Sequence, residues 1–213
     1  MIIVHHLNNS RSQRVLWLLE ELGIEYEIKL YERDAKTMLA PESLRQVHPL
    51  GKSPAIVDAD QTIAESGAII DYLVGRYGNG QLVPALGTPE RLRYTYWLHY
   101  AEGSAMPPLL LKLIFDKFGV GDSDAVSGFI APQIKLHFDY IEGELSKNTW
   151  FVGEEFTAAD IQMSFPIEMV AMLPEQVENR PKLKEFLDRI HARPAYKRAL
   201  EQGGNYENFF VSS

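Results

Sequence analysis

Residues 48–66 restrict the fold of this chain more than any other stretch. Pro54 has no amide hydrogen to give to a sheet, so it is tolerated at the first residue of a strand, and the apolar residues 55–57 after it are predicted to be that strand. Residues 58–61 are typical of a turn, residues 62–64 of a second strand, and Glu65 and Ser66 of the start of a helix. The stretch therefore predicts a strand, a turn, a second strand and a helix in one compact unit.

The peptide bond between Ser53 and Pro54 has two possible isomers, and the sequence leaves the choice open. Only a bond to proline adopts the cis form at low cost, and a cis bond here would turn the backbone of Ser53 outward to pair with a peptide-like ligand. The trans form is the more common one and would make Pro54 an ordinary strand start.

Three polar side chains of this stretch suit a ligand that carries both signs of charge. Ser66 lies near a predicted helix N-terminus, where free amides and the helix dipole favour an anion. Glu65 could take an ammonium group, and Lys52 could hold a second, distant carboxylate as a point charge. Glu65 and Ser66 are each equally typical of plain helix capping, so only their combination with Lys52 favours a ligand.

The same stretch resembles a known family. His-Pro-Leu-Gly-Lys-Ser-Pro at 48–54, followed by Ala-Glu-Ser-Gly-Ala-Ile at 64–69, is similar to the glutathione-binding half of the soluble glutathione transferases, in a bacterial or fungal-like form. Glutathione is a tripeptide with a zwitterionic glutamyl end, a thiol in the middle and a carboxylate at the other end. The resemblance implies that glutathione is bound by five residues: Lys52, Ser53, Pro54, Glu65 and Ser66.

The order of predicted elements divides the chain. A strand at residues 2–7, a helix at 13–22 and a strand at 24–31 favour parallel pairing, and with the unit above they give a thioredoxin-like α/β domain at 1–78. Residues 79–87 are predicted to be a linker. Residues 88–213 are predicted to be an all-α helical domain, which is the glutathione transferase architecture.

Composition excludes several kinds of protein. The net charge of −8 and the absence of a basic run argue against nucleic-acid binding. The chain has no cysteine, so any sulfur chemistry uses the substrate's sulfur, and the six histidines have no metal-ligand spacing. Since no signal peptide and no apolar run of membrane-spanning length is present, we expect a cytoplasmic protein that binds neither membrane nor metal.

A loop after the first strand is the candidate for holding the sulfur. A thiol is mostly protonated at neutral pH, whereas the thiolate is the nucleophile, so an enzyme must stabilise that anion. The loop Asn-Asn-Ser-Arg-Ser-Gln-Arg-Val resembles the serine-type loop of the family, which implies Ser10 as the catalytic residue. Asn9 and Arg11 remain alternatives for the contact with sulfur, because the register is open by one residue. Ser10 could also serve only as a helix cap.

The second substrate is expected to be a small apolar electrophile bound by helical residues. Met106 and Phe115 are the candidates, together with Tyr100, Leu110 and the aromatic residues of the C-terminal tail, although each is equally typical of a helical core. Leu92, Tyr96, Trp97 and Tyr100 are predicted to form the apolar face of a helix that starts at residues 88–90. The resemblance implies that homodimers meet across this helix.

The predicted activity is conjugation of the glutathione thiolate to apolar electrophiles, in detoxification, with glutathione as co-substrate and no permanently bound cofactor. Two alternatives remain open at this point. One is a glutathione-dependent peroxidase or disulfide reductase, and the other is a non-catalytic module that binds glutathione or a protein. The thiol pKa of bound glutathione separates the non-catalytic module from the transferase, since a module that only binds glutathione would leave this pKa unshifted.

Overall fold

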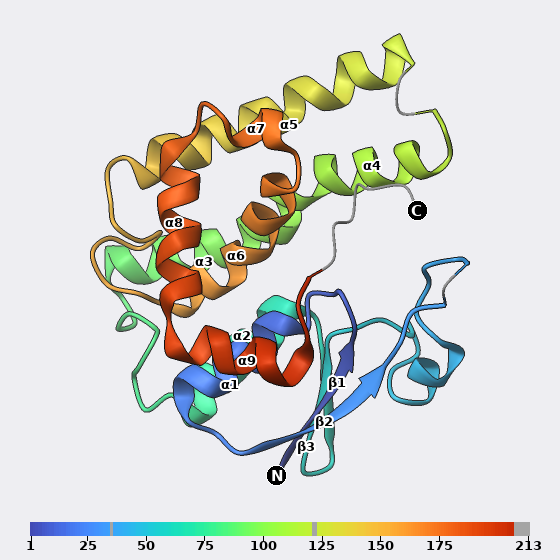
Figure 1. Cartoon of the computed structure of the whole chain (residues 1–213). Coiled ribbons are helices and arrows are strands. Elements are labelled where there is room, and N and C mark those ends of the chain that lie inside the picture. Colours follow the sequence, from blue (N-terminus) through green and yellow to red (C-terminus); the bar gives the residue numbers. More distant parts are fainter. Residues whose placement is uncertain (35, 121–122, 207–213) are drawn as a thin grey trace. The chain divides into compact units, whose positions relative to one another are not determined.

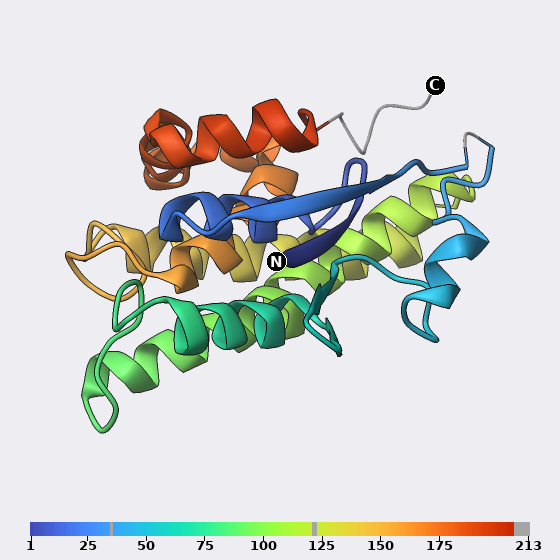
Figure 2. The same cartoon turned by 90° about the horizontal axis from the view of Figure 1, so that it is seen from below.

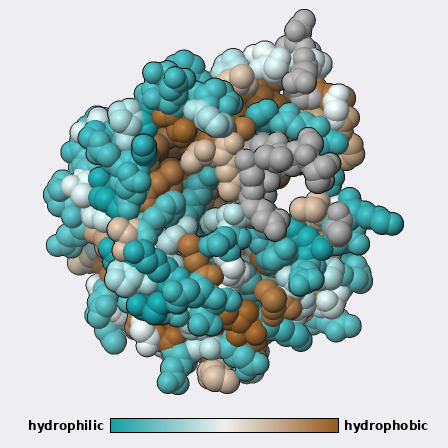
Figure 3. Space-filling view, viewed as in Figure 1, coloured by the Kyte–Doolittle hydropathy of each residue, from teal (hydrophilic) through white to brown (hydrophobic). Residues whose placement is uncertain are grey.

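The computed structural model describes residues 1–34, 36–120 and 123–206, and it contains two compact units. The first unit is Met1–Val83 with the described residues of His191–Glu207, and the second contains Pro84–Ile190 (Figure 1). Within the described residues, none of the helices has the length and apolarity needed to cross a membrane. The face viewed in Figure 3 is mainly hydrophilic with separate hydrophobic spots.

The first unit is built on a four-stranded mixed sheet in the order β2-β1-β3-β4. β1 (Ile2–Leu7) pairs in parallel with β2 (Tyr26–Tyr31) and antiparallel with β3 (Ala55–Asp58), which pairs antiparallel with β4 (Gln61–Ala64). The parallel pairing follows from the helix between β1 and β2, because a crossover connection returns the chain in the same direction.

Two α-helices and a short 3-10 helix belong to this sheet. α1 (Gln13–Leu22) connects β1 to β2 and ends at Gly23, whose φ of 64° is the left-handed cap that glycine adopts without a steric cost. η1 (Glu42–Gln46) lies between β2 and β3, and α2 (Ser66–Tyr77) follows β4. With the helices of the second unit described below, this arrangement confirms the predicted thioredoxin-like α/β part followed by an all-helical part.

One helix from the far end of the chain belongs to the first unit. α9 (Pro194–Gly203) packs against α1, as Figures 1 and 2 both show. Arg193 donates to both carboxylate oxygens of Glu21, at 2.5 and 2.8 Å, and the rings of Trp17 and Tyr196 meet edge to face at 5.1 Å. The sequence placed residues 88–213 in one helical domain, and these long-range contacts have no local signal that could show the return of α9. The limits of the domains stay a prediction.

The second unit is helical. It contains α3 (Pro89–Tyr100), a π-helical segment η2 (Ala101–Ala105), α4 (Met106–Lys117), α5 (Asp124–Leu145), α6 (Ala158–Ala171), α7 (Pro174–Val177) and most of α8 (Pro181–Ala192). The Pro107-Pro108 pair lies in the first turn of α4, directly after the π-helical segment η2.

Burial on α3 differs in part from the predicted apolar face. Trp97 is fully buried, but Leu92 is 74% and Tyr96 44% exposed, whereas Tyr94 is fully buried. Helical spacing placed the face correctly at Trp97 and wrongly at Leu92, because the buried stripe runs through Tyr94 and Trp97. The exposed pair therefore lies beside this stripe rather than within it.

Asp160 fixes the start of α6. Its carboxylate accepts from the backbone N–H of Thr157 at 2.7 Å, which is one half of a capping box, and from the backbone N–H of Phe151 at 2.8 Å. Because Asp160 is fully buried, desolvation outweighs these bonds and raises its pKa to about 6.

Candidate functional site

The loop after β1 places Ser10 against the first turn of α1. Asn9 has a φ of 50°, and Ser10 is 5% exposed. The Ser10 hydroxyl accepts from the backbone N–H of Ser12 at 3.2 Å and lies 2.8 Å from the Ser12 hydroxyl. These bonds belong to a local turn just before α1, whose N-cap residue is Ser12, and the predicted contact of Ser10 with sulfur stays a proposal.

Two residues behind Ser10 were not predicted. The Ser12 hydroxyl lies 2.8 Å from Nδ1 of His6, and Nε2 of His6 lies 2.8 Å from the carbonyl oxygen of Gly203 at the end of α9. Strand alternation places His6 on one face of β1, but only the packing of α9 shows what that face meets. The loop that carries Ser10 is therefore linked by hydrogen bonds to His6 on β1 and, through His6, to the end of α9.

Arg14 connects α1 to the start of α2. Its Nη2 donates to the Ser66 hydroxyl at 3.0 Å, and the two residues are 1% and 4% exposed. The buried guanidinium places a permanent positive charge beside the predicted anion site. The sequence shows Arg14 only as a residue inside the predicted helix at 13–22, which is equally typical of a structural role.

Glu65 has an unusual backbone conformation, with a φ of 71° and a ψ of 121°. Positive φ is costly for a residue with a long side chain and is concentrated at ligand sites. Glu65 is exposed, and the residue after it is the buried Ser66. The residue before Ser10 and the residue before Ser66 therefore both have positive φ.

The loop before β3 is attached to β1 through a side chain. The Ser53–Pro54 peptide bond is cis. The Ser53 hydroxyl donates to the carbonyl of His5 at 3.0 Å and accepts from the N–H of Leu7 at 3.3 Å. The Ser53 hydroxyl is therefore used within the fold, and pairing of its backbone with a ligand stays a prediction. Pro54 is buried and Lys52 is exposed.

Strand register brings these loops to one edge of the sheet. His5 pairs with Ala55, and Ala55 pairs with Ala64. Because β1 runs antiparallel to β3 and β3 to β4, the loops that follow β1, precede β3 and follow β4 all leave the sheet on the same side. The structure therefore gathers the loops of six predicted residues at one edge: Ser10, Lys52, Ser53, Pro54, Glu65 and Ser66.

Two arginines give this edge positive charge. Nη2 of Arg33 donates to the carbonyl of Asn9 at 3.2 Å, and its backbone N–H donates to the side chain of Asn8 at 2.9 Å. Burial, and next the positive charge of Arg11, lower the pKa of Arg33, so the two guanidinium groups act on each other. Arg33 was not predicted, because residues 32–46 show no clear periodicity.

The residues predicted to bind the electrophile lie in the second unit. Met106 is 2% exposed at the start of α4, and Phe115 is half-buried near its end. Their role stays a prediction. Tyr206 of the tail is described, whereas Phe209 and Phe210 lie outside the described residues.

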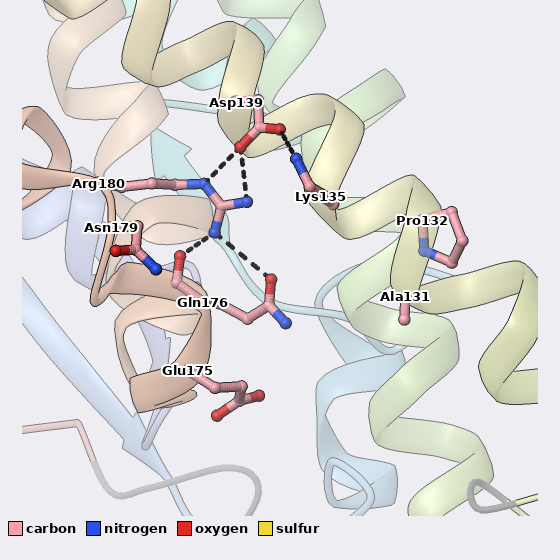
Figure 4. Close-up of a pocket in the computed structure, with 8 residues that line it drawn as sticks. All are labelled: Ala131, Pro132, Lys135, Asp139, Glu175, Gln176, Asn179 and Arg180. Carbon is pink, nitrogen blue, oxygen red and sulfur yellow. Dashed lines mark hydrogen bonds and ion pairs between the residues drawn. The ribbon is translucent and has the colours of Figure 1, made fainter.

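The second unit also contains a cavity of about 590 Å³ whose lining includes none of the predicted site residues (Figure 4). The guanidinium of Arg180 points from its wall to Asp139 and Gln176, and Lys135 also donates to Asp139. Bonds from Lys135 and then Arg180 lower the pKa of Asp139. Because these charges satisfy one another, we assign no ligand here. No group of three potential metal ligands occurs among the described residues.

Comparison with known proteins agrees with the resemblance of the loops. The family model for the glutathione S-transferase N-terminal domain matches residues 1–75, and the model for the C-terminal domain matches residues 131–194. Glutathione S-transferase 3 of Schizosaccharomyces pombe is 37% identical over 220 residues, which cover 95% of this chain and 88% of that protein.

Two solved structures have the same fold over almost the whole chain. A glutathione S-transferase from Actinobacillus pleuropneumoniae is 36% identical, with a TM-score of 0.87 and 99% of both chains covered. A glutathione transferase family member from Pseudomonas fluorescens, with two glutathione bound, is 29% identical, with a TM-score of 0.78 and 94% of this chain and 92% of that chain covered. From these matches and the geometry of the loops, this chain belongs to the glutathione S-transferase family.

Proposed function

We propose that this protein binds glutathione at the loop edge of its sheet and conjugates it, through its thiolate sulfur, to small apolar electrophiles. The observation that carries the proposal is that the loops of Ser10 and Ser66 leave the sheet on the same side, with the buried Arg14 bonded to Ser66 at the start of α2. The Pseudomonas fluorescens relative with two glutathione bound supports the choice of ligand.

The two charged ends of glutathione have separate partners. The ammonium of the glutamyl end meets the Glu65 carboxylate, and the neighbouring carboxylate meets the Ser66 hydroxyl and the free amides of α2. Arg14 strengthens this anion site, because its positive charge is buried and lies 3.0 Å from the Ser66 hydroxyl. Lys52 meets the carboxylate at the other end, while the Ser53 backbone pairs with the peptide and Pro54 shapes that loop.

Ser10 is the residue that we propose for the sulfur. Asn9 and Arg11 remain alternatives for this contact. Arg11 and Arg33 supply a positive field that favours the thiolate over the thiol. The thiolate then adds to an electrophile or displaces its leaving group, and the electrophile lies against apolar residues of the helical unit, Met106 and Phe115 among them.

The wider role follows the family. We propose a cytoplasmic homodimer that acts in detoxification, with dimers formed through α3. Leu92, Tyr96 and, on α5, Leu136 support this contact, being 74%, 44% and 61% exposed. Sedimentation of the wild type at two concentrations and of Leu92→Glu tests it, since a charge at that position should shift the dimer to the monomer.

Turnover tests the activity itself. The purified protein, given glutathione and an aryl halide, should form the thioether, and Ser10→Ala should lower kcat by about 100-fold, the effect of losing one donor at a developing anion. Ser10→Thr should keep part of the rate because it keeps the hydroxyl. Reduction of a peroxide without thioether formation would favour the peroxidase alternative, and binding without either reaction would favour the non-catalytic module.

A further inference from the structure

A chain of hydrogen bonds runs from Ser10 through the interior of the first unit to the end of α9. Ser10 Oγ lies 2.8 Å from Ser12 Oγ, Ser12 Oγ lies 2.8 Å from His6 Nδ1, and His6 Nε2 lies 2.8 Å from the Gly203 carbonyl oxygen. His6 and Ser12 are 1% and 0% exposed. Water therefore has little access to the links between the candidate sulfur site and the carbonyl.

The carbonyl at the far end fixes the direction of every bond. A carbonyl oxygen only accepts, so His6 Nε2 carries a hydrogen, and in the neutral ring Nδ1 is then an acceptor. Ser12 donates to Nδ1, and Ser10 donates to Ser12. The Leu7 carbonyl, 3.3 Å from Ser12 Oγ, competes for the same hydrogen over a longer distance.

This direction decides what Ser10 can offer to a ligand. Its hydrogen is given to Ser12, and one lone pair accepts from the backbone N–H of Ser12. The remaining lone pair can accept a hydrogen from a thiol, whereas a thiolate needs a donor. The resting chain therefore suits glutathione in its protonated form.

We propose that His6 is a positioning residue that receives the thiol proton of glutathione through Ser10 and Ser12. The inference rests on the proposed function. The S–H bond breaks, its electron pair stays on sulfur, and its proton joins Ser10 Oγ. The former Ser10 proton moves to Ser12 Oγ, and the former Ser12 proton moves to His6 Nδ1. Both hydroxyls stay neutral, and the thiolate and the imidazolium leave the net charge unchanged.

After this transfer every bond of the chain is reversed and still satisfied. His6 donates to Ser12, Ser12 donates to Ser10, and Ser10 donates to the thiolate, which is the bond that the anion needs. If Ser10 turned to the sulfur without the transfer while Ser12 still donated to His6, the oxygens of Ser10 and Ser12 would face each other at 2.8 Å with no hydrogen between them. The reversal thus couples the charge of His6 to the charge of the sulfur.

The surroundings of His6 fit an acceptor that is neutral before the ligand binds. Burial lowers the pKa of His6, and the bond to the Gly203 carbonyl opposes this only in part. A thiolate near Ser10 would raise that pKa again by its negative charge. The ionisable groups on the elements packed around His6 have partners of their own: His5 with Tyr31, Arg14 with Ser66, Arg193 with Glu21 and Arg198 with Glu20.

The end of α9 approaches His6 closely because residue 203 is glycine. A Cβ at this position would lie 3.1 Å from Cε1 of His6 and 2.3 Å from Oε1 of the buried Gln13. A larger residue would clash with the side chains of Gln13 and Leu16, so either these side chains or α9 would have to move. The carbonyl that sets the direction of the chain therefore depends on this glycine.

The test compares the thiolate formed with the protons released when the full-length protein binds glutathione. Thiolate is read from its ultraviolet absorbance, and protons from calorimetry in two buffers of different ionisation enthalpy. The wild type should release far less than one proton per thiolate, because His6 keeps it. His6→Gln, which can bond to Gly203 but cannot hold the extra proton, and Ser12→Ala should each release about one. His5→Gln, on the same strand but bonded to Tyr31, is the matched control and should behave as the wild type.

Several results would overturn the proposal. If the wild type releases one proton per thiolate, as the two variants do, the relay is wrong while the proposed function stands. If no thiolate forms in the wild type, the transferase function and the relay both fail. Nitrogen-15 NMR of the ligand-free wild type gives a test without any variant: His6 should be neutral with its hydrogen on Nε2, and a hydrogen on Nδ1 instead contradicts the direction of the chain.

Discussion

Arg14 Nη2 donates to the Ser66 hydroxyl across 3.0 Å, and this bond joins the interior of α1 to the first residue of α2. Both side chains are buried, so the positive charge acts through a medium that screens it weakly. The contact makes the N-terminus of α2 a stronger anion site than the helix dipole alone would.

Replacing this charge tests the anion site. Arg14→Gln keeps a donor for Ser66 but removes the charge, and we expect the Kd for glutathione to rise about 10- to 100-fold, since bonds to charged groups contribute about 1.5–3 kcal/mol. Calorimetric titration measures it. Arg76→Gln, at the exposed C-terminal end of the same helix, is the control and should bind as the wild type. An unchanged Kd for Arg14→Gln would remove Arg14 from the site.

Replacement of Glu65 by glycine should have opposite effects on the stability of the fold and on glutathione binding. Its φ of 71° is strained for glutamate, so Glu65→Gly should raise the free energy of unfolding by about 1 kcal/mol. The same change removes the carboxylate for the glutamyl ammonium and should weaken glutathione binding at least tenfold. Ala59→Gly, in a turn with a φ of 55°, should gain stability and keep binding. Denaturant titration and calorimetry separate the two effects, and a Glu65→Gly protein that binds normally would contradict the assigned role.

Asp160 gives a pH dependence of known sign. Its pKa of about 6 in the folded protein lies above the ordinary 3.8, so the folded state holds the proton more tightly, and stability from this group falls as pH rises from about 4 to about 6. The fall is (6 − 3.8) × 1.36, or about 3 kcal/mol. The free energy of unfolding of the wild type minus that of Asp160→Asn should decrease by this amount between pH 4 and pH 7. A difference that stays constant or increases would contradict the raised pKa.

The attachment of α9 to α1 depends on the two hydrogen bonds that the Arg193 guanidinium donates to the Glu21 carboxylate. Arg193→Lys cannot bond to both oxygens of Glu21 and should lower the free energy of unfolding by about 1–2 kcal/mol. Arg198→Lys, at the more exposed pair with Glu20, should cost less than about 0.5 kcal/mol. Denaturant titration of the two variants measures the contrast, and equal losses would show that burial of Glu21 does not matter.

Local patterns predicted the elements that position the site. The limits of α1 follow from the apolar spacing before Gly23, and the strand after Pro54 follows from the missing amide hydrogen. The return of α9 to α1 could not be predicted, because the ion pair of Arg193 with Glu21 joins residues 172 positions apart.

Motifs predicted the loops of the candidate site, but they did not predict the side chains that hold these loops in place. Ser10 and Ser66 were named from their positions at strand ends and helix starts. His6, Ser12 and Arg33 have no motif of their own, since their roles arise from side chains that meet only after the strands and α9 have packed. Arg14 is one residue of the helix predicted at 13–22, but only its burial beside Ser66 shows that its charge lies at the candidate anion site.

The thiol pKa of glutathione bound to the wild type tests the central claim most directly. Thiolate absorbance is followed from acid to alkaline pH with the protein in excess, beside Ser10→Ala and free glutathione. We predict that the bound thiol titrates at least one pH unit below the free thiol in the wild type, and close to the free thiol in Ser10→Ala. A bound thiol that titrates like free glutathione in the wild type would contradict the claim that this protein activates the sulfur.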